Sequence, residues 1–306
     1  MAAPSIALAL ALGGPVAAQP APATPLTVCL DAEVPPLSVR QGQDGGGFDV
    51  EVARRVAALL GRPLAVQWFE TKADPDSFPD REANALLSDG RCQLVGGYPL
   101  TARTIGKPLS ERSRLPGFAG ARPEDRRRWV NIGTLVPSAA YRAASLGVVL
   151  GPAQSGLQFR HLAELQGLRL GVEKRTLPDA ILTRYRGGVL FDRVTHVLAG
   201  TGLFERLEAG DYDAVLVETQ RWDAWAARHP ENRLRLAEYR HPVGFNFGFV
   251  GLATEAPLLE AVNGAIVRMR EAGELPALAR QAGLTYAAPL LPEVTPPIAP
   301  AALRDD

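Results

Sequence analysis

Sulfur and histidine are scarce in this chain of 306 residues, which contains two cysteines, two methionines and four histidines. Two thiols and a few scattered imidazoles make no cluster of the kind that holds zinc, so we predict no metal site. The formal net charge is +0, which gives no reason to expect binding to nucleic acid or to an anionic membrane surface. No apolar run is long enough to span a bilayer, so we expect a protein that is not membrane-embedded.

Catalytic signatures are also missing. The chain has no Gly-x-Ser-x-Gly elbow, no His-Glu-x-x-His pair and no glycine-rich phosphate loop. We therefore predict a protein that is not an enzyme and needs no cofactor. One alternative stays open, in which Glu51 and Glu218 form an acid/base pair across a cleft. The histidines are interpreted as surface or capping residues: His161, His196, His229 and His241.

What the chain does contain is a globular composition. Hydrophobic residues make up 46% and charged residues 22% of the sequence, which predicts a sizeable core. The length leaves room for two domains of ordinary size.

The uncharged residues 1–18 predict a secretory signal peptide. A short apolar run spans residues 6–12, and the last three residues, Val-Ala-Ala, fit the small-x-small rule for cleavage. Residues 19–25 are rich in proline and alanine, and we expect them to form a linker. These features predict a periplasmic protein. The alternative is a flexible leader on a cytosolic one.

The two cysteines are Cys29 and Cys92. An isolated pair in an exported protein is typical of a disulfide, so we predict that these residues are bonded to each other. Two unpaired, buried thiols are the alternative.

Residues 26–61 form the segment around which the rest of the chain is organised. Leu26, Val28 and Leu30 alternate with more polar neighbours, which predicts a strand with two distinct faces. A Pro-Pro pair ends this strand, and three consecutive glycines lead into an amphipathic helix. Gly61 is placed to end the helix.

The same alternation continues along the chain. Up to residue 98 it predicts β-α-β-α-β, an open sheet, and residues 151–240 repeat the theme. Ligands bind at the carboxyl ends of strands in such sheets, which makes Asp31 a candidate ligand-binding residue. Residues 107–133 are rich in arginine and proline and predict a surface excursion, either functional or a solvated insertion. The Pro-rich residues 287–306 predict an extended or loose tail.

Four segments carry a family resemblance when they are taken in order. They are LTVCLDAEVPPLS…GGGFDVEVARRVAALLG, LAELQGLRLGVEKRT, LEAGDYDAVLVE, and a closing strand with paired helices that begins FGFVGLATEAPLLEAV. Together they resemble the bacterial extracellular solute-binding proteins of the amino-acid-binding type. The resemblance implies the periplasmic binding protein type II fold, an α/β fold of two lobes with open mixed sheets joined by two crossing strands. The implied lobes are residues 26–140 plus 243–285 and residues 145–242, and the strands that carry the cysteines are then neighbours.

The resemblance also implies which residues hold a ligand. Arg103 resembles the family's carboxylate-binding arginine, and Thr101 would offer its hydroxyl and N–H to the same carboxylate. Glu218 stands at the family's second-lobe aspartate position, where an ammonium group would bind. Thr176 resembles the threonine of the family's anion-binding loop.

Two further candidates follow from the same comparison. Glu51 stands at the acidic position of the family's helix start, which makes it a ligand-binding candidate. Leu37 replaces the aromatic residue on which the family stacks its ligand, and we expect Tyr98 to substitute for it.

A distinct branch of the fold provides the alternative function. VCLDAEVPPLS and DGRCQLVGGYPL are similar to the two-cysteine pattern of the periplasmic J-type accessory proteins of quinoprotein methanol and alcohol dehydrogenases. The first hypothesis is capture of a small polar, amino-acid-like solute for import by an ABC permease. The second is docking to a quinoprotein dehydrogenase, with residues 107–133 as the candidate docking segment. The third is an enzyme on the same fold, such as a dehydratase or a cell-wall lyase.

Overall fold

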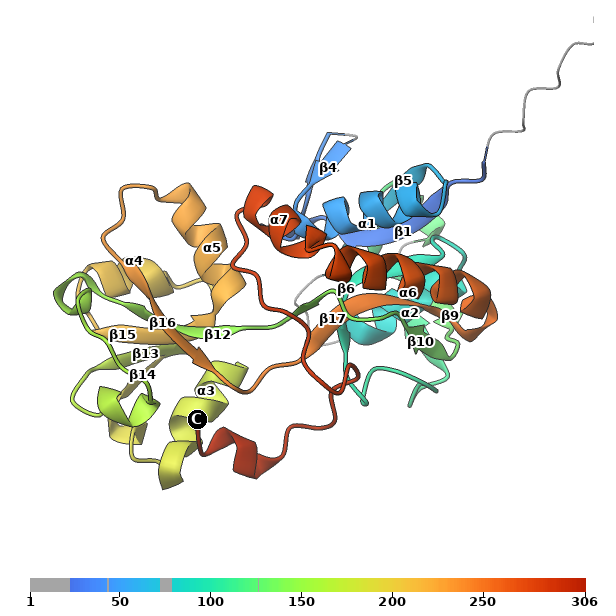
Figure 1. Cartoon of the computed structure of the whole chain (residues 1–306). Coiled ribbons are helices and arrows are strands. Elements are labelled where there is room, and N and C mark those ends of the chain that lie inside the picture. Colours follow the sequence, from blue (N-terminus) through green and yellow to red (C-terminus); the bar gives the residue numbers. More distant parts are fainter. Residues whose placement is uncertain (1–22, 43, 72–78, 126) are drawn as a thin grey trace, which may run out of the picture.

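The computed structural model describes residues 23–42, 44–71, 79–125 and 127–306. The chain forms two α/β lobes, each organised around one open sheet (Figure 1). This architecture confirms the fold class predicted from the sequence. The predicted signal peptide and most of the linker lie outside the described residues.

The first lobe is built on a seven-stranded sheet with the strand order β10-β17-β6-β1-β5-β8, in which β11 also pairs with β17. Strands β5, β1 and β6 are mutually parallel, as βαβ units require, whereas β17 runs antiparallel to β6. The strands are β1 (Leu26–Asp31), β5 (Leu64–Glu70), β6 (Leu94–Leu100), β8 (Gly117–Phe118), β10 (Leu135–Pro137), β11 (Arg142–Ala143) and β17 (Asn246–Leu252).

Helices cover both faces of this sheet. One apolar cluster packs α1 (Phe48–Leu59), α6 (Ala256–Glu271) and α7 (Glu274–Gln281) against Leu26, Val28 and Leu30. A second cluster packs α2 (Pro79–Ser88) against Cys29 and the opposite face. Alternate residues of β1 therefore face two different apolar clusters, so this strand is buried on both sides of the sheet.

The second lobe is built on a five-stranded sheet with the order β14-β13-β15-β12-β16. Helix α3 (Leu177–Arg184) packs on one face, whereas α4 (Leu203–Glu208) and α5 (Thr219–Arg228) pack on the other. The strands are β12 (Leu146–Leu150), β13 (Leu170–Glu173), β14 (Val194–Val197), β15 (Ala214–Glu218) and β16 (Arg235–His241).

Shorter elements complete the described residues. A three-stranded sheet contains β2 (Glu33–Val34), β3 (Ser38–Gln41) and β4 (Asp44–Gly46). The 3-10 helices are η1 (Pro123–Asp125), η2 (Pro152–Gln154), η3 (Leu162–Leu165), η4 (Tyr185–Gly187), η5 (Phe191–Arg193), η6 (Ala253–Glu255) and η7 (Pro300–Leu303). Within the described ranges, no helix has both the length and the apolarity that crossing a bilayer requires.

The chain passes into the second lobe after β11 and returns to the first lobe after β16 (Figure 1). The first sheet takes its strands from residues 26–143 and 246–252, and the second from residues 146–241. We propose lobe boundaries at these two crossings.

The disulfide predicted from the sequence is present. Cys29 and Cys92 are bonded, and their Cα atoms lie 5.6 Å apart. Cys29 belongs to β1, and Cys92 lies two residues before β6, the parallel neighbour of β1. The bond therefore ties two adjacent strands at the centre of the first lobe.

Residues 107–133 contain more regular structure than the sequence predicted. Strands β7 (Arg112–Arg114) and β9 (Trp129–Asn131) form a two-stranded antiparallel sheet, and β8 joins the edge of the first lobe's sheet. Leu115 and Val130 are buried in the cluster with α2. The apolar residues that fix these short strands occur singly among arginines, so they produce no detectable period.

Residues 287–306, for which the sequence left an extended or a loose tail open, follow an extended path that is packed against both lobes. We call this segment the C-terminal strap. At the first lobe, the backbone N–H of Thr295 donates to Leu100 O at 2.8 Å, and Ala102 N–H donates to Thr295 O at 2.9 Å. Glu293 accepts from Arg270 at 2.7 Å. These bonds add the strap alongside the end of β6 (Figure 1).

The strap reaches the second lobe through Asp306. Its carboxylate accepts hydrogen bonds from Tyr185 OH at 2.6 Å, from Tyr239 OH at 2.8 Å and from Leu162 N–H at 2.7 Å. The side chain is only 1% exposed. The composition of the segment did not predict the burial of Asp306, because an acidic residue in a Pro-rich tail is ordinarily exposed.

We expect Asp306→Ala to lower the free energy of unfolding by about 2 kcal/mol, because three donors lose a charged acceptor. Burial alone raises the pKa of Asp306, but the bonds from Tyr185, Leu162 and Tyr239 outweigh it, so the pKa is lowered. A depressed folded-state pKa stabilises the protein above the unfolded value of about 3.9, and this stabilisation is lost as the pH falls further. Urea unfolding at neutral and acid pH measures both effects. The neighbouring Asp305→Ala is the control, because the Asp305 side chain is 80% exposed. Equal stability of the two variants at neutral pH would contradict the role of Asp306 as an anchor.

Candidate functional site

Three charged side chains gather where the two lobes join: Asp49, Arg142 and Glu218. Asp49 lies in the first turn of α1, Arg142 in the crossing strand β11, and Glu218 at the end of β15. The residue Leu146 pairs with Glu218 across the second sheet, which brings the end of β15 next to the crossing. We call these three residues the junction trio.

Asp49 is held rigidly by its surroundings. The side chain is 3% exposed. Gly97 adopts a left-handed conformation with φ +65°, and a Cβ atom there would lie 2.6 Å from Asp49 Oδ2. Glycine at position 97 is therefore required both by the backbone and by the close approach of this carboxylate. Burial raises the pKa of Asp49, whereas Arg142 and the Tyr141 hydroxyl oppose that rise.

Arg142 supplies the positive charge of the trio. It is 3% exposed, its Nε lies 3.4 Å from Asp49 Oδ1, and its guanidinium carbon lies 3.7 Å from the centre of the Phe247 ring. Phe247 is its partner in the antiparallel pairing of β11 with β17. Among the described residues, Asp49 is the one hydrogen-bond acceptor of this side chain, and the Nη groups donate to none. A guanidinium has five N–H donors, so most of its capacity is left for another partner.

Glu218 is the carboxylate that the second lobe contributes. It stands at the N-cap position of α5, and its described side-chain hydrogen bond comes from Gln220 Nε2 at 3.2 Å. Burial raises the pKa of Glu218, and the positive charge of Arg142 opposes that rise. A partly buried carboxylate with one amide donor is incompletely compensated.

The trio as a whole has two carboxyl groups and one guanidinium. Ionisation of both acids leaves an excess of one negative charge in a poorly solvated region. The neighbouring Arg221 does not compensate for this excess, because it is paired with Glu173. A bound ammonium group would supply a positive partner for Glu218, and the unused Nη donors of Arg142 would suit a carboxylate.

The structure brings two of the predicted ligand-binding residues together. Thr176 and Glu218 both line a hollow of about 10 Å³ at the carboxyl ends of the second sheet, together with Glu173 and Arg221. The Thr176 hydroxyl already donates to Glu173 O at 2.7 Å and accepts from Asp179 N–H at 3.3 Å as the N-cap of α3. Thr176 therefore organises the loop beside Glu218.

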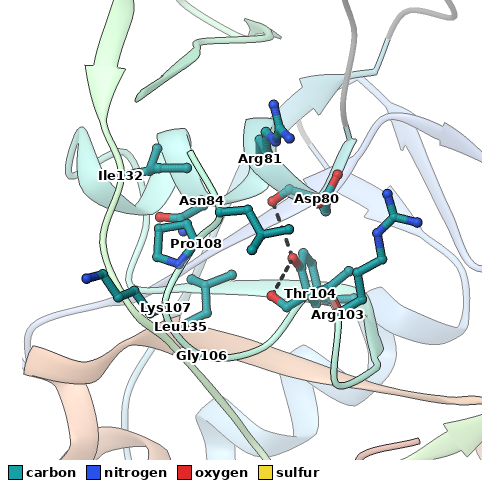
Figure 2. A pocket seen from close by; sticks show the side chains of 12 residues that line it. Asp80, Arg81, Asn84, Arg103, Thr104, Gly106, Lys107, Pro108, Ile132 and Leu135 are labelled. Atoms are coloured by element: carbon teal, nitrogen blue, oxygen red, sulfur yellow. Dashed lines mark hydrogen bonds between the residues drawn. The ribbon is translucent and has the colours of Figure 1, made fainter. Parts of the chain in front are cut away.

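Two predicted residues lie away from the trio in a separate cavity of about 80 Å³ in the first lobe. Tyr98 and Arg103 line it together with residues of α2 and of the segment that precedes β7 (Figure 2). Tyr98 is buried, and its hydroxyl lies 3.3 Å from the carbonyl oxygens of both Asp80 and Thr104. Burial raises the pKa of Tyr98. Arg103 is exposed.

The remaining predicted residues have local partners. Asp31 accepts from Glu33 N–H at 3.0 Å at the end of β1. Burial raises the pKa of Asp31, and the bonds from Glu33 and Thr71 oppose that rise. Glu51 is paired with Arg54 on the solvent side of α1. Thr101 forms a β-bridge with Thr295 of the C-terminal strap.

The sequence reasoning missed Asp49 and Arg142. A signal was present in both cases. Asp49 interrupts the apolar residues Phe48, Val50 and Val52, so it occupies a buried position of the helix. Arg142 stands among small and apolar residues of the crossing segment. A charged residue within such a run is informative because burial without a partner is costly.

No group of three or more His, Cys, Asp or Glu residues suited to a metal ion occurs among the described positions.

Neither family models nor curated proteins match the chain. Solved structures do match it over most of its length. The second substrate-binding domain of a putative amino acid ABC transporter from Streptococcus pneumoniae aligns with a TM-score of 0.60 at 15% identity, over 84% of this chain and 98% of that chain. The unliganded, open L-cystine solute receptor of Neisseria gonorrhoeae aligns with a TM-score of 0.57 at 18% identity, over 84% and 92%.

An enzyme is also among the similar structures. An ancestral cyclohexadienyl dehydratase aligns with a TM-score of 0.52 at 17% identity, over 84% of this chain and 92% of that chain. Identities this low show the fold alone, and this fold occurs both in the binding proteins and in the ancestral dehydratase. The chain thus has the two-lobed α/β fold of the periplasmic binding proteins.

Proposed function

We propose that this protein binds a small, amino-acid-like solute at the junction of its two lobes. The observation that carries the proposal is the junction trio, in which the first lobe and the crossing strand contribute a buried guanidinium and the second lobe contributes an undercompensated carboxylate. An α-amino acid offers the complementary pair of charges. Its ammonium would bind Glu218, and its carboxylate would bind the Nη groups of Arg142.

Arg103 and Thr101 remain the carboxylate partners that the resemblance implies. We favour Arg142 because it is buried and oriented by Asp49 and Phe247, whereas Arg103 is exposed. A preorganised guanidinium loses less conformational entropy when it binds a ligand. The backbone of Thr101 is already bridged to the strap.

We also propose that the protein is periplasmic and that it delivers the solute to an ABC permease. A disulfide between buried cysteines is typical of an oxidising compartment, which supports the periplasmic location expected from residues 1–18. The similar structures include receptors and domains of transport systems, which supports delivery of the solute to an ABC permease.

The C-terminal strap favours a second candidate function. Solute capture in hinged proteins requires the lobes to separate. A segment bonded to Leu100 in the first lobe and to Tyr185 and Tyr239 in the second lobe restrains that motion. A restrained pair of lobes suits a docking protein, such as the quinoprotein dehydrogenase accessory that the cysteine pattern resembles.

A thermal-shift screen with L-amino acids tests the first proposal. A true ligand stabilises the folded state by about 2.7 kcal/mol at a hundredfold excess over its Kd. We expect at least one amino acid to raise the melting temperature of the wild type, and to raise that of Glu218→Gln by a smaller amount. Absence of any shift across the panel would contradict solute capture and leave docking as the better account.

The pH dependence of binding provides an independent prediction. Burial raises the pKa of Glu218 in the free protein, so the ionised form is disfavoured in the folded state. The folded state therefore loses stability as the pH rises from the unfolded pKa of this residue to its folded pKa. A ligand ammonium requires the ionised form. We therefore expect affinity to fall on acidification at a pH above the ordinary glutamate value of about 4.3. Calorimetric titrations at several pH values measure this, and Glu218→Gln should lack the dependence.

A further inference from the structure

A second surface in the first lobe carries two arginines without a carboxylate partner among the described residues. Arg112 and Arg114 are two residues apart on β7, so their side chains leave the same face of the strand, and Trp129 pairs with Arg114 across the ribbon. The guanidinium carbons lie 5.9 Å and 5.1 Å from the Trp129 ring centre. We call these three residues the Arg–Trp face. It is far in sequence from Glu218 and shares no residue with the junction trio.

The two arginines differ from others in the same segment. Arg122 is paired with Glu124 and Asp125, and Arg128 is paired with Asp89. By contrast, Arg112 and Arg114 form no ion pair with any carboxylate in the part of the chain that the structure describes, and their observed partner is an aromatic ring. Their guanidinium forks are therefore available to carboxylates from outside the chain.

The surface around them is hollowed, and Trp129 gives it an exposed apolar side chain. A hollow of about 230 Å³ is lined by both arginines and Trp129, and also by Ser110, Ser113, Arg81 and Glu82. Trp129 is 50% exposed, and Leu109, next to Ser110, is 87% exposed. Large exposed apolar side chains beside arginine are typical of interface anchors.

We propose that the Arg–Trp face docks an acidic segment of a partner protein. Carboxylates of the partner bind Arg112 and Arg114, while an apolar side chain packs on Trp129 in the hollow. The partner is acidic because three arginines and one glutamate line the hollow, which leaves positive charge in excess. It is a protein segment because the exposed Trp129 calls for apolar burial as well as charge. The inference does not depend on which solute the junction trio takes.

Fluorescence anisotropy of a labelled peptide of alternating glutamate, aspartate and leucine tests this proposal at low ionic strength. A serine–leucine peptide of equal length reports binding that does not depend on charge. The test variant is Arg112→Ala/Arg114→Ala. The matched control is Arg160→Ala/Arg193→Ala, which removes two exposed arginines from the second lobe and leaves the net charge equal to that of the test variant.

We expect the acidic peptide to bind the wild type and the control equally, and to bind the test variant about tenfold more weakly. Trp129→Ala should weaken binding similarly without any change in charge. Circular dichroism establishes that each variant is folded. Equal binding to both double variants would overturn the proposal, since it would reduce the interaction to net charge. Failure of the acidic peptide to bind better than the serine–leucine peptide would also overturn it.

Discussion

Replacing Arg142 by alanine is expected to lower the free energy of unfolding by about 3–5 kcal/mol and to abolish solute binding. The guanidinium is buried against Asp49 and Phe247, so its removal leaves a buried carboxylate without a counter-charge and exposes one face of a ring. Urea unfolding measures the stability, and thermal shift measures the binding.

The double variant Asp49→Asn/Arg142→Met separates charge from packing. It removes both members of the buried pair and keeps similar volumes, so most of the lost stability should return. Arg103→Ala is the second control, because Arg103 is exposed in the lining of another cavity. We expect it to leave stability unchanged. If Arg103→Ala abolished binding and Arg142→Ala did not, the carboxylate would belong to Arg103, as the resemblance implies.

Removal of the disulfide is the second change with a large expected effect. The bond joins residues 63 positions apart, and loop-closure entropy for a loop of that length corresponds to about 4 kcal/mol. We expect Cys29→Ala/Cys92→Ala to be destabilised by that amount, with a small further loss because both side chains are buried.

The reduced wild type distinguishes connectivity from packing in this experiment. It keeps both sulfur atoms in place and loses only the covalent link, so its urea midpoint should lie close to that of the double variant. A reduced wild type as stable as the oxidised protein would show that β1 and the start of β6 are held by the sheet alone.

Much of the fold was predictable because it depends on local periodicity. Burial of one face of a strand or helix produces a periodic pattern of apolar residues in the sequence. This pattern is present in β1, at Leu26, Val28 and Leu30, and in α6, at Leu259, Val262, Ile266 and Met269. The disulfide was predictable because the chain has only two cysteines.

The features that escaped prediction depend on contacts between distant segments. Asp306 is separated from Tyr185 by 121 positions, and nothing near either residue announces the other. Asp49 and Arg142 are likewise 93 positions apart, and although each is a charge within an apolar run, neither sequence context identifies the other as its partner. Glu218 was predicted from the resemblance, and its place at the end of β15 makes it accessible to the crossing strand. The partners of buried charges therefore cannot be predicted from the residues that surround each of them in the sequence.

The central claim is that Arg142 and Glu218 hold the two charged ends of one solute. Titration calorimetry with three forms of the amino acid that gives the largest thermal shift tests it most directly: the zwitterion, its deaminated acid and its carboxamide. The account predicts that the wild type binds the zwitterion much more tightly than the deaminated acid, and that Glu218→Gln removes this preference while the preference over the carboxamide persists. Equal binding of the zwitterion and the deaminated acid by the wild type, or an unchanged preference in Glu218→Gln, would contradict it.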